Sequence, residues 1–179
     1  MVMEIKKSQF NLKSKRGFTL IEALIAISIL IIGIVSSFIL VTRALYNTNI
    51  IQDRLTASFL AQEGLELVRQ IRDSNYLNKI NGGSINWDNN LAPGNYRISF
   101  ENGLEKIQNP NDAQLYFHDD SGLFNYISSD GKLTSFSRKI NIEQISSDEL
   151  KITTIINWQT KGSEYTIQVE DHLFNWLPL

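Results

Sequence analysis

At residues 13–24, KSKRGFTLIEAL, a basic segment changes within two residues into an apolar one. The last basic residue of this stretch is Arg16, and residues 18–41 contain one acidic residue, Glu22, and no basic residue. As a helix, residues 18–41 would be about 36 Å long, which exceeds the hydrocarbon core of a bilayer. The stretch therefore predicts a helix that spans a membrane.

Glu22, the acidic residue in this apolar run, has a free-energy cost inside a membrane. A carboxylate at the centre of a bilayer costs about 2.5–3.5 kcal/mol on the insertion scale, and less near the interface. No basic residue within the run can pair with Glu22, so we expect its partner to come from outside the chain. The alternative is an interfacial acid whose side chain reaches water.

Residues 15–22, KRGFTLIE, followed by the apolar run, resemble the N-terminal signal of type IV pilins and pseudopilins. The resemblance covers the first third of the chain. It implies that a prepilin peptidase cuts between Gly17 and Phe18 and methylates the new amine of Phe18. It also implies that Glu22, the fifth residue after the cut, pairs with the N-terminal amine of a neighbouring subunit during assembly.

Two other kinds of N-terminal segment compete with this interpretation. A secretory signal peptide has an apolar region of about 7–15 residues, and the run here is much longer. An uncleaved signal anchor remains an alternative, but it leaves the Gly17–Phe18 junction and Glu22 unexplained.

The charge distribution predicts an orientation. The first 17 residues are strongly basic, while the whole chain of 179 residues carries a net charge of −2, so the remainder is acidic. A short basic flank stays in the cytoplasm, which places the acidic remainder outside. The acidic sign argues against nucleic acid as the main partner. The absence of cysteine excludes disulfides and thiolate metal sites.

After residue 41 the apolar run becomes an apolar stripe with helical spacing. We expect one continuous helix over residues 18–74, interrupted only by a weak point at Gly64, which costs about 1 kcal/mol against alanine. The stripe consists of Leu45, Ile51, Leu55, Phe59, Leu65, Val68 and Ile71.

The remainder alternates apolar and polar residues between turn sequences, which predicts an antiparallel meander. The expected strands are residues 95–100, 114–117, 123–128, 135–145, 150–159 and 165–173, and residues 174–179 are expected against the edge of the domain. The fold class is thus α+β: a long N-terminal helix packed on a C-terminal antiparallel sheet, as in pilins. The expected divisions are a leader (1–17), a membrane helix (18–41), an amphipathic half (42–74) and an extracytoplasmic sheet domain (75–179).

Other candidate sites favour structural interpretations. The His118-Asp119-Asp120 sequence could bind calcium, as loops of some pseudopilins do, but Asp and Gly are common in such turns for backbone reasons. His172 is expected as a neighbour in the last strand rather than a ligand. The tryptophans and tyrosines could form an adhesive surface, but packing is favoured. No catalytic, cofactor or metal site is expected.

The predicted function is non-enzymatic: a prepilin that lies in the cytoplasmic membrane with its N-terminus inside, and then joins a filament at the cell surface. Its partners would be the prepilin peptidase and methyltransferase, membrane lipid before assembly, and other pilins. Residues 60–69, LAQEGLELVR, and the strand with Trp158 resemble minor pilins. The alternatives are a pseudopilin of a type II secretion or DNA-uptake system, an adhesin or binding module at a filament tip, and a membrane-tethered enzyme.

Overall fold

The computed structural model of the chain describes residues 17–176. It consists of one long helix, α1 (Leu20–Ile80), followed by seven strands and one short 3₁₀ helix. The chain divides into two compact units, Met1–Tyr46 and Asn47–Leu179, and the division falls within α1. The predicted basic leader lies outside the described residues, apart from Gly17.

The described part of the first unit is helical from Leu20 onward and apolar on every side. Large apolar side chains of residues 18–41 are between 47% (Ile39) and 85% (Leu20) exposed. By length and composition, α1 contains a segment able to cross a membrane. A helix that is apolar all round is typical of a lipid or protein surround rather than of water.

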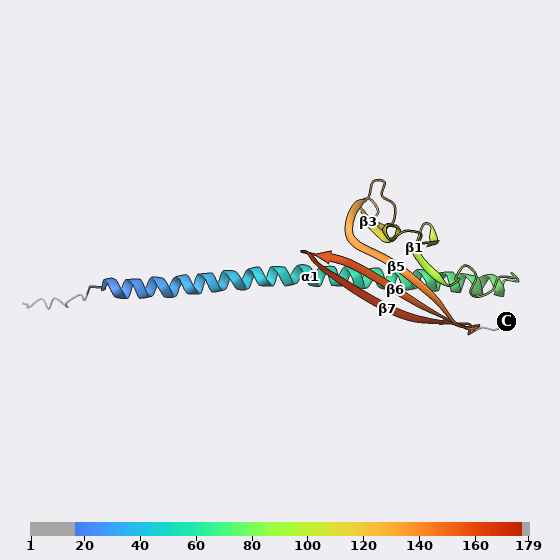
Figure 1. Ribbon diagram of the computed structural model, residues 1–179, viewed down its shortest axis with the longest axis horizontal. Coiled ribbons are helices and arrows are strands. Elements are labelled where there is room, and N and C mark those ends of the chain that lie inside the picture. Colours follow the sequence, from blue (N-terminus) through green and yellow to red (C-terminus); the bar gives the residue numbers. More distant parts are fainter. Residues whose placement is uncertain (1–16, 177–179) are drawn as a thin grey trace, which may run out of the picture. The chain divides into compact units, whose positions relative to one another are not determined.

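In the second unit, strands β5 (Lys132–Ser146), β6 (Glu149–Thr160) and β7 (Ser163–Phe174) run alongside the C-terminal part of α1 (Figure 1). All strand pairs are antiparallel. The expected α+β fold, a long helix packed on an antiparallel sheet, is confirmed.

The sheet departs from a simple meander on one side of β5. One end of β5 pairs with β3 (Gln114–His118), and a more C-terminal part of β5 pairs with β1 (Gly94–Ser99). The strands β2 (Gly103–Lys106) and β4 (Leu123–Asn125) pair with β1 and β3, and the 3₁₀ helix spans Pro110–Ala113. The expected meander therefore holds for β5–β6–β7, whereas β1 and β3 are not neighbours. The sequence analysis also missed β2, because it is short, mostly polar and paired on one side.

The helix ends at Ile80 rather than near residue 74. Asn75 and Tyr76 are buried, and the side-chain amide of Asn75 donates to the carbonyls of Trp87 (3.0 Å) and Asn89 (2.8 Å). Gly82, at φ +90°, then closes the helix. Its N–H bonds the Lys79 carbonyl, while the Gly83 N–H bonds that of Asn78, the two bonds of a Schellman motif.

The contact between α1 and the sheet differs from the expected stripe. Ile51, Leu55 and Phe59 are 64%, 55% and 62% exposed. The helix buries Leu65 and Val68 of the expected stripe, together with Leu60 and the small residues Ala57, Ala61 and Gly64, which the stripe did not include. Small residues let two backbones approach closely, so the sheet packs against the part of α1 that has the smallest side chains.

Two apolar clusters fill this interface. One gathers Ile140, Ile142, Leu150 and Ile152 around Val68 and Tyr76, and the other gathers Phe136, Ile156 and Trp158 around Ala57 and Leu60. A row of five aromatic side chains extends the second cluster, and the centroids of neighbouring rings lie 5.1–6.3 Å apart. In order, the rings are those of Phe117, Phe124, Phe136, Trp158 and Tyr165. Trp158 and Tyr165, two of the residues considered for an adhesive surface, thus pack against neighbouring rings.

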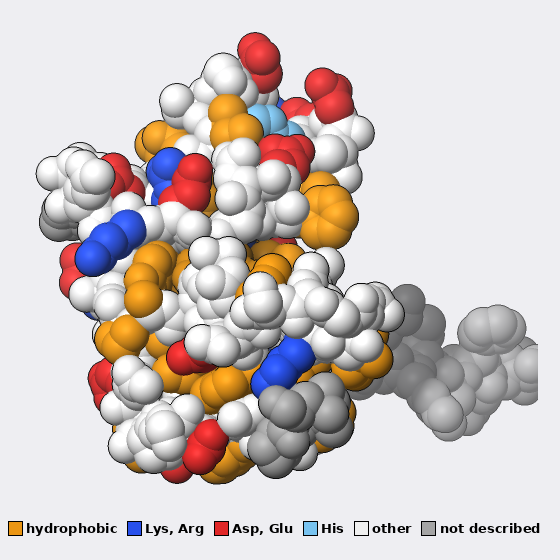
Figure 2. Space-filling view, turned by 90° about the vertical axis from the view of Figure 1, so that its right-hand side faces the viewer, with side chains coloured by type: hydrophobic (Ala, Val, Ile, Leu, Met, Phe, Trp, Pro, Cys, Tyr) orange, Lys and Arg blue, Asp and Glu red, His pale blue; other side chains and the backbone are white. Residues whose placement is uncertain are grey.

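On the face drawn in Figure 2, acidic and basic side chains are interspersed, and apolar side chains are visible between them. Exposed apolar residues of the second unit include Phe100 (76%) in the β1–β2 loop and Leu133 (70%) in β5.

Candidate functional site

Gly17 and Phe18 lie immediately before α1, outside any regular element. Gly17 is exposed, and Phe18 is 72% exposed. A Cβ atom built on Gly17 meets no described atom within 4 Å, and its backbone does not have the left-handed φ that favours glycine. The packing of the described chain therefore does not require glycine at this position.

Glu22 lies in the first turn of α1, where Thr19 caps the helix. The Glu22 N–H donates to Oγ1 of Thr19 (3.3 Å), and that hydroxyl donates to the Glu22 carboxylate (3.4 Å). This is the Thr-x-x-Glu pattern of a capping box, although the carboxylate accepts from the hydroxyl rather than from the backbone. Its negative charge also suits the positive end of the helix dipole.

The sequence analysis missed this local partner of Glu22, although a threonine three residues before the acid was a sufficient signal. The hydroxyl is neutral, so this hydrogen bond does not balance the charge of the carboxylate. Within residues 17–176, no basic side chain forms an ion pair with Glu22.

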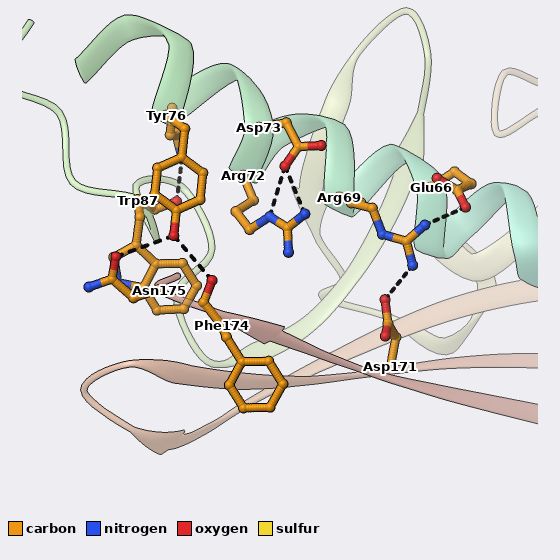
Figure 3. A network of polar contacts seen from close by, with 10 residues as sticks. Glu66, Arg69, Arg72, Asp73, Tyr76, Trp87, Asp171, Phe174 and Asn175 are labelled. Carbon is orange, nitrogen blue, oxygen red and sulfur yellow. Dashed lines mark hydrogen bonds and ion pairs between the residues drawn. The ribbon is translucent and has the colours of Figure 1, made fainter. Parts of the chain in front are cut away.

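Polar contacts fasten the second part of α1 to the end of the sheet (Figure 3). Arg69 bonds Asp171 of β7 at 2.7 Å and Glu66 of its own helix at 2.5 Å. The Tyr76 hydroxyl donates to the Phe174 carbonyl (3.1 Å), and its ring lies 5.1 Å from that of Trp176. The expected contact of the C-terminal segment with the domain is present for residues 174–176; residues 177–179 lie outside the described part.

A buried arginine connects three elements between the two apolar clusters. Arg138 of β5 is 0% exposed. Its guanidinium donates to the carbonyls of Leu60 in α1 (3.2 Å) and Ile98 in β1 (2.8 Å), to Glu63 (2.9 Å) and to the Tyr126 hydroxyl (3.0 Å). Burial opposes the charge, but Tyr126 and Glu63 outweigh it, and the pKa of Arg138 is raised above its ordinary value.

The other candidate residues, His118, Asp119 and His172, contact neighbouring residues of the sheet. His118 and Asp119 lie where β3 turns into β4. The Gly122 N–H donates to the His118 carbonyl (2.8 Å) and closes this turn, and Asp119 forms an ion pair with Lys132. His172 contacts Glu149 at 2.6 Å across β6 and β7. Among residues 17–176, no group of three or more His, Cys, Asp or Glu side chains is arranged to hold a metal ion.

Comparison with known proteins identifies the N-terminal segment. Residues 12–38 match the family model described as the prokaryotic N-terminal methylation motif. No curated protein and no solved structure matches the chain. The match includes Gly17, Phe18, Glu22 and most of the apolar run, while the fold that follows is a helix on an antiparallel sheet. The chain thus carries the prepilin signal of type IV pilins and pseudopilins at the head of a pilin-like α+β fold.

Proposed function

We propose that the chain is a precursor, cut between Gly17 and Phe18, methylated at Phe18, and assembled through its N-terminal helix as a subunit of a type IV pilus or related filament. We place it among the minor pilins. Before assembly it lies in the cytoplasmic membrane with its basic leader inside, and afterwards at the cell surface. Its role is structural rather than enzymatic.

The observation that carries this proposal is the methylation motif over residues 12–38. The surroundings of Gly17 support it, because neither space nor backbone conformation in the described chain calls for glycine there. A requirement for glycine would then come from an enzyme that binds this segment in an extended, unhindered form.

The position of Glu22 supports assembly through the helix. Processing would create a positive amine on Phe18, and the same amine on a neighbouring subunit would face the Glu22 carboxylate. In a water-poor helix bundle an attraction between opposite charges is several times stronger than in water. Such a pair would fix the axial position of one helix against another.

Processing is tested by expressing the full-length chain together with a prepilin peptidase and measuring the mass of the N-terminal peptide of the purified chain. We expect a methylated Phe18 terminus for the wild type and an uncut precursor for Gly17→Val. Because a Cβ at Gly17 touches nothing in the described chain, the variant should fold normally, and a normally cut Gly17→Val would contradict the proposal.

Assembly is tested by separating the charge of Glu22 from its capping role. Glu22→Gln keeps a residue that suits a capping box but removes the charge, whereas Thr19→Val removes the cap and keeps the charge. We expect processing in both variants and loss of incorporation into sheared filaments for Glu22→Gln only. Equal recovery of Glu22→Gln and wild type would contradict the pairing.

A further inference from the structure

Strand β7 forms the long free edge of the sheet and is the outermost of the three long strands (Figure 1). Among residues 17–176 it pairs with β6 alone, and this pairing runs from Ser163 to Phe174 without a shift in register. The strands at the other edges, β2 and β4, have only four and three residues. An edge strand presents a row of unpaired N–H and C=O groups to its surroundings.

A hydrogen bond at the end of β7 shows which of its backbone groups face outward. The Asn175 N–H donates to the carbonyl of Asp148 (2.8 Å), which lies opposite it, one step beyond the Glu149–Phe174 pair. In an antiparallel ladder, hydrogen-bonded pairs alternate with pairs that exchange no hydrogen bond. The odd-numbered residues of β7 therefore bond to β6, and the even-numbered residues direct their N–H and C=O groups away from it.

The C-terminal part of this outward edge is already occupied. The Phe174 carbonyl accepts a hydrogen bond from Tyr76 (3.1 Å), and the His172 N–H donates to Oδ1 of Asp171 (2.9 Å). Within the part of the chain that the structure describes, no hydrogen bond reaches the outward backbone groups of residues 164–170, which are those of Glu164, Thr166, Gln168 and Glu170. This open segment contains no lysine and no proline, two residues that commonly protect an edge strand from further pairing.

An apolar row accompanies the open edge on the face of β7 that packs against the apolar clusters. Tyr165, Ile167 and Val169 belong to the margin of the second cluster, and all three are only partly buried. A strand added beside β7 would place its own alternate side chains next to this row. Apolar residues at every second position of that strand would therefore extend the core.

The opposite face of β7 is acidic at both ends of the open segment. Glu164 and Glu170 are exposed, and the residues between them on this face, Thr166 and Gln168, are uncharged. Glu170 pairs with Lys151 (3.1 Å), whereas no basic side chain among residues 17–176 forms an ion pair with Glu164. Since β7 contains neither lysine nor arginine, basic side chains in an added strand would complement it.

We propose that residues 164–170 of β7 bind an extended segment of another protein, which joins the sheet as an antiparallel strand. This segment carries apolar residues at alternate positions and a basic residue at each end. Its backbone supplies affinity, and its alternate side chains supply selectivity. A second copy of β7 is a poorer partner, because the register that places Ile167 opposite itself would set Glu164 against Glu170 twice. The site lies outside the methylation motif, so binding requires neither processing nor assembly through α1.

The test uses the full-length protein in detergent micelles and a fluorescently labelled peptide, Lys-Val-Thr-Val-Thr-Val-Lys, whose binding is followed by anisotropy. With its valines beside the apolar row, the lysines meet Glu164 and Glu170. Replacing both lysines by glutamate should weaken binding several-fold. Methylating the two threonine nitrogens, which otherwise donate to β7, should weaken it by on the order of tenfold or more.

A matched pair of protein variants locates the site. Gln168→Pro removes an N–H that faces outward and does not take part in the β6–β7 ladder, whereas Gln168→Thr keeps it. We expect Gln168→Pro to weaken binding by on the order of tenfold and Gln168→Thr to bind like the wild type. In hydrogen exchange, the peptide should protect the amides of Thr166 and Gln168 and leave that of Ile167, which already bonds to β6, unchanged.

Three results would overturn the proposal. They are no binding to the wild type at about 1 mM peptide, equal binding of the methylated peptide, and protection confined to other amides. Should Gln168→Pro lose its cooperative urea transition, the methylated peptide and the exchange data decide. Amides of Thr166 and Gln168 that are protected without peptide, and become exposed when the protein is diluted, would instead identify a second copy as the occupant and refute the proposed partner.

Discussion

Replacing Gly64 by alanine probes the closest approach of α1 to the sheet. A Cβ atom at this position would lie 2.9 Å from Cδ1 of Ile140 and 3.2 Å from Cγ2 of Thr154. Both neighbours are 0% exposed, so neither can move aside into solvent. Alanine gains about 1 kcal/mol in helix propensity, whereas overpacking a filled core costs about 1–3 kcal/mol. We expect Gly64→Ala to lower the free energy of unfolding by about 1 kcal/mol.

A double-mutant cycle identifies the cause. Ile140→Val removes the very atom that the new Cβ would meet and should cost about 0.5–1.5 kcal/mol alone. With Gly64→Ala it should cost less than the sum of the single changes, by about 1 kcal/mol.

The assay is urea unfolding of the full-length protein in detergent, followed by the fluorescence of the buried Trp87 and Trp158. Gly33→Ala is the matched control, because a Cβ at that helical glycine meets nothing within 4 Å. A Gly64→Ala protein as stable as the wild type, or strictly additive changes in the cycle, would refute the reasoning.

Three further expectations concern single side chains of the second unit. Arg138→Met should lower the free energy of unfolding by about 1–3 kcal/mol, because it leaves the buried carbonyls of Leu60 and Ile98 without their donor, whereas Glu63, 41% exposed, can be hydrated; a urea midpoint close to that of the wild type would contradict this. Thr154→Val should raise the midpoint, since the buried Thr154 hydroxyl has no hydrogen-bond partner among residues 17–176 and an unsatisfied hydroxyl costs about 1–3 kcal/mol; an unchanged or lower midpoint would show that the hydroxyl is satisfied. The backbone N–H groups of Asn109 and Gln108 lower the pKa of Asp112, so its contribution to stability is present above the ordinary pKa of aspartate and lost as the pH falls through the lowered value. Asp112→Asn should remove that part of the acid dependence in unfolding curves measured across the acid range, and an identical pH profile would argue against it.

The sequence was sufficient for the features that depend on local pattern. The apolar run and the KRGFTLIE signal required no knowledge of the fold, and alternation located the three long strands to within a few residues. Three shorter strands were found approximately, as residues 95–100, 114–117 and 123–128. Each of these features is encoded in consecutive residues, so no distant contact had to be inferred.

The details that were missed depend on contacts between distant segments. Gly64 was interpreted as a weak point of the helix, but its lack of a side chain is what allows Ile140 and Thr154 to approach. Ile51, Leu55 and Phe59 have helical spacing, yet they lie on a side that the sheet does not cover. The burial of Arg138 could not be predicted from its strand alone. Its guanidinium is buried because α1, β1 and Tyr126, which are distant in sequence, surround it.

The fastening of β7 to α1 has a consequence for the order of folding. Arg69 meets Asp171 across 102 residues, and Tyr76 meets Phe174 across 98. Contacts so far apart in sequence form slowly, because a long loop must close before they contribute. While the chain folds, the small-residue face of α1 therefore stays uncovered until β5 and β6 reach it, because Ile140 and Thr154 are the residues that approach Gly64. A chaperone or a neighbouring helix that shields this face during the delay would govern how much of the protein reaches its native state.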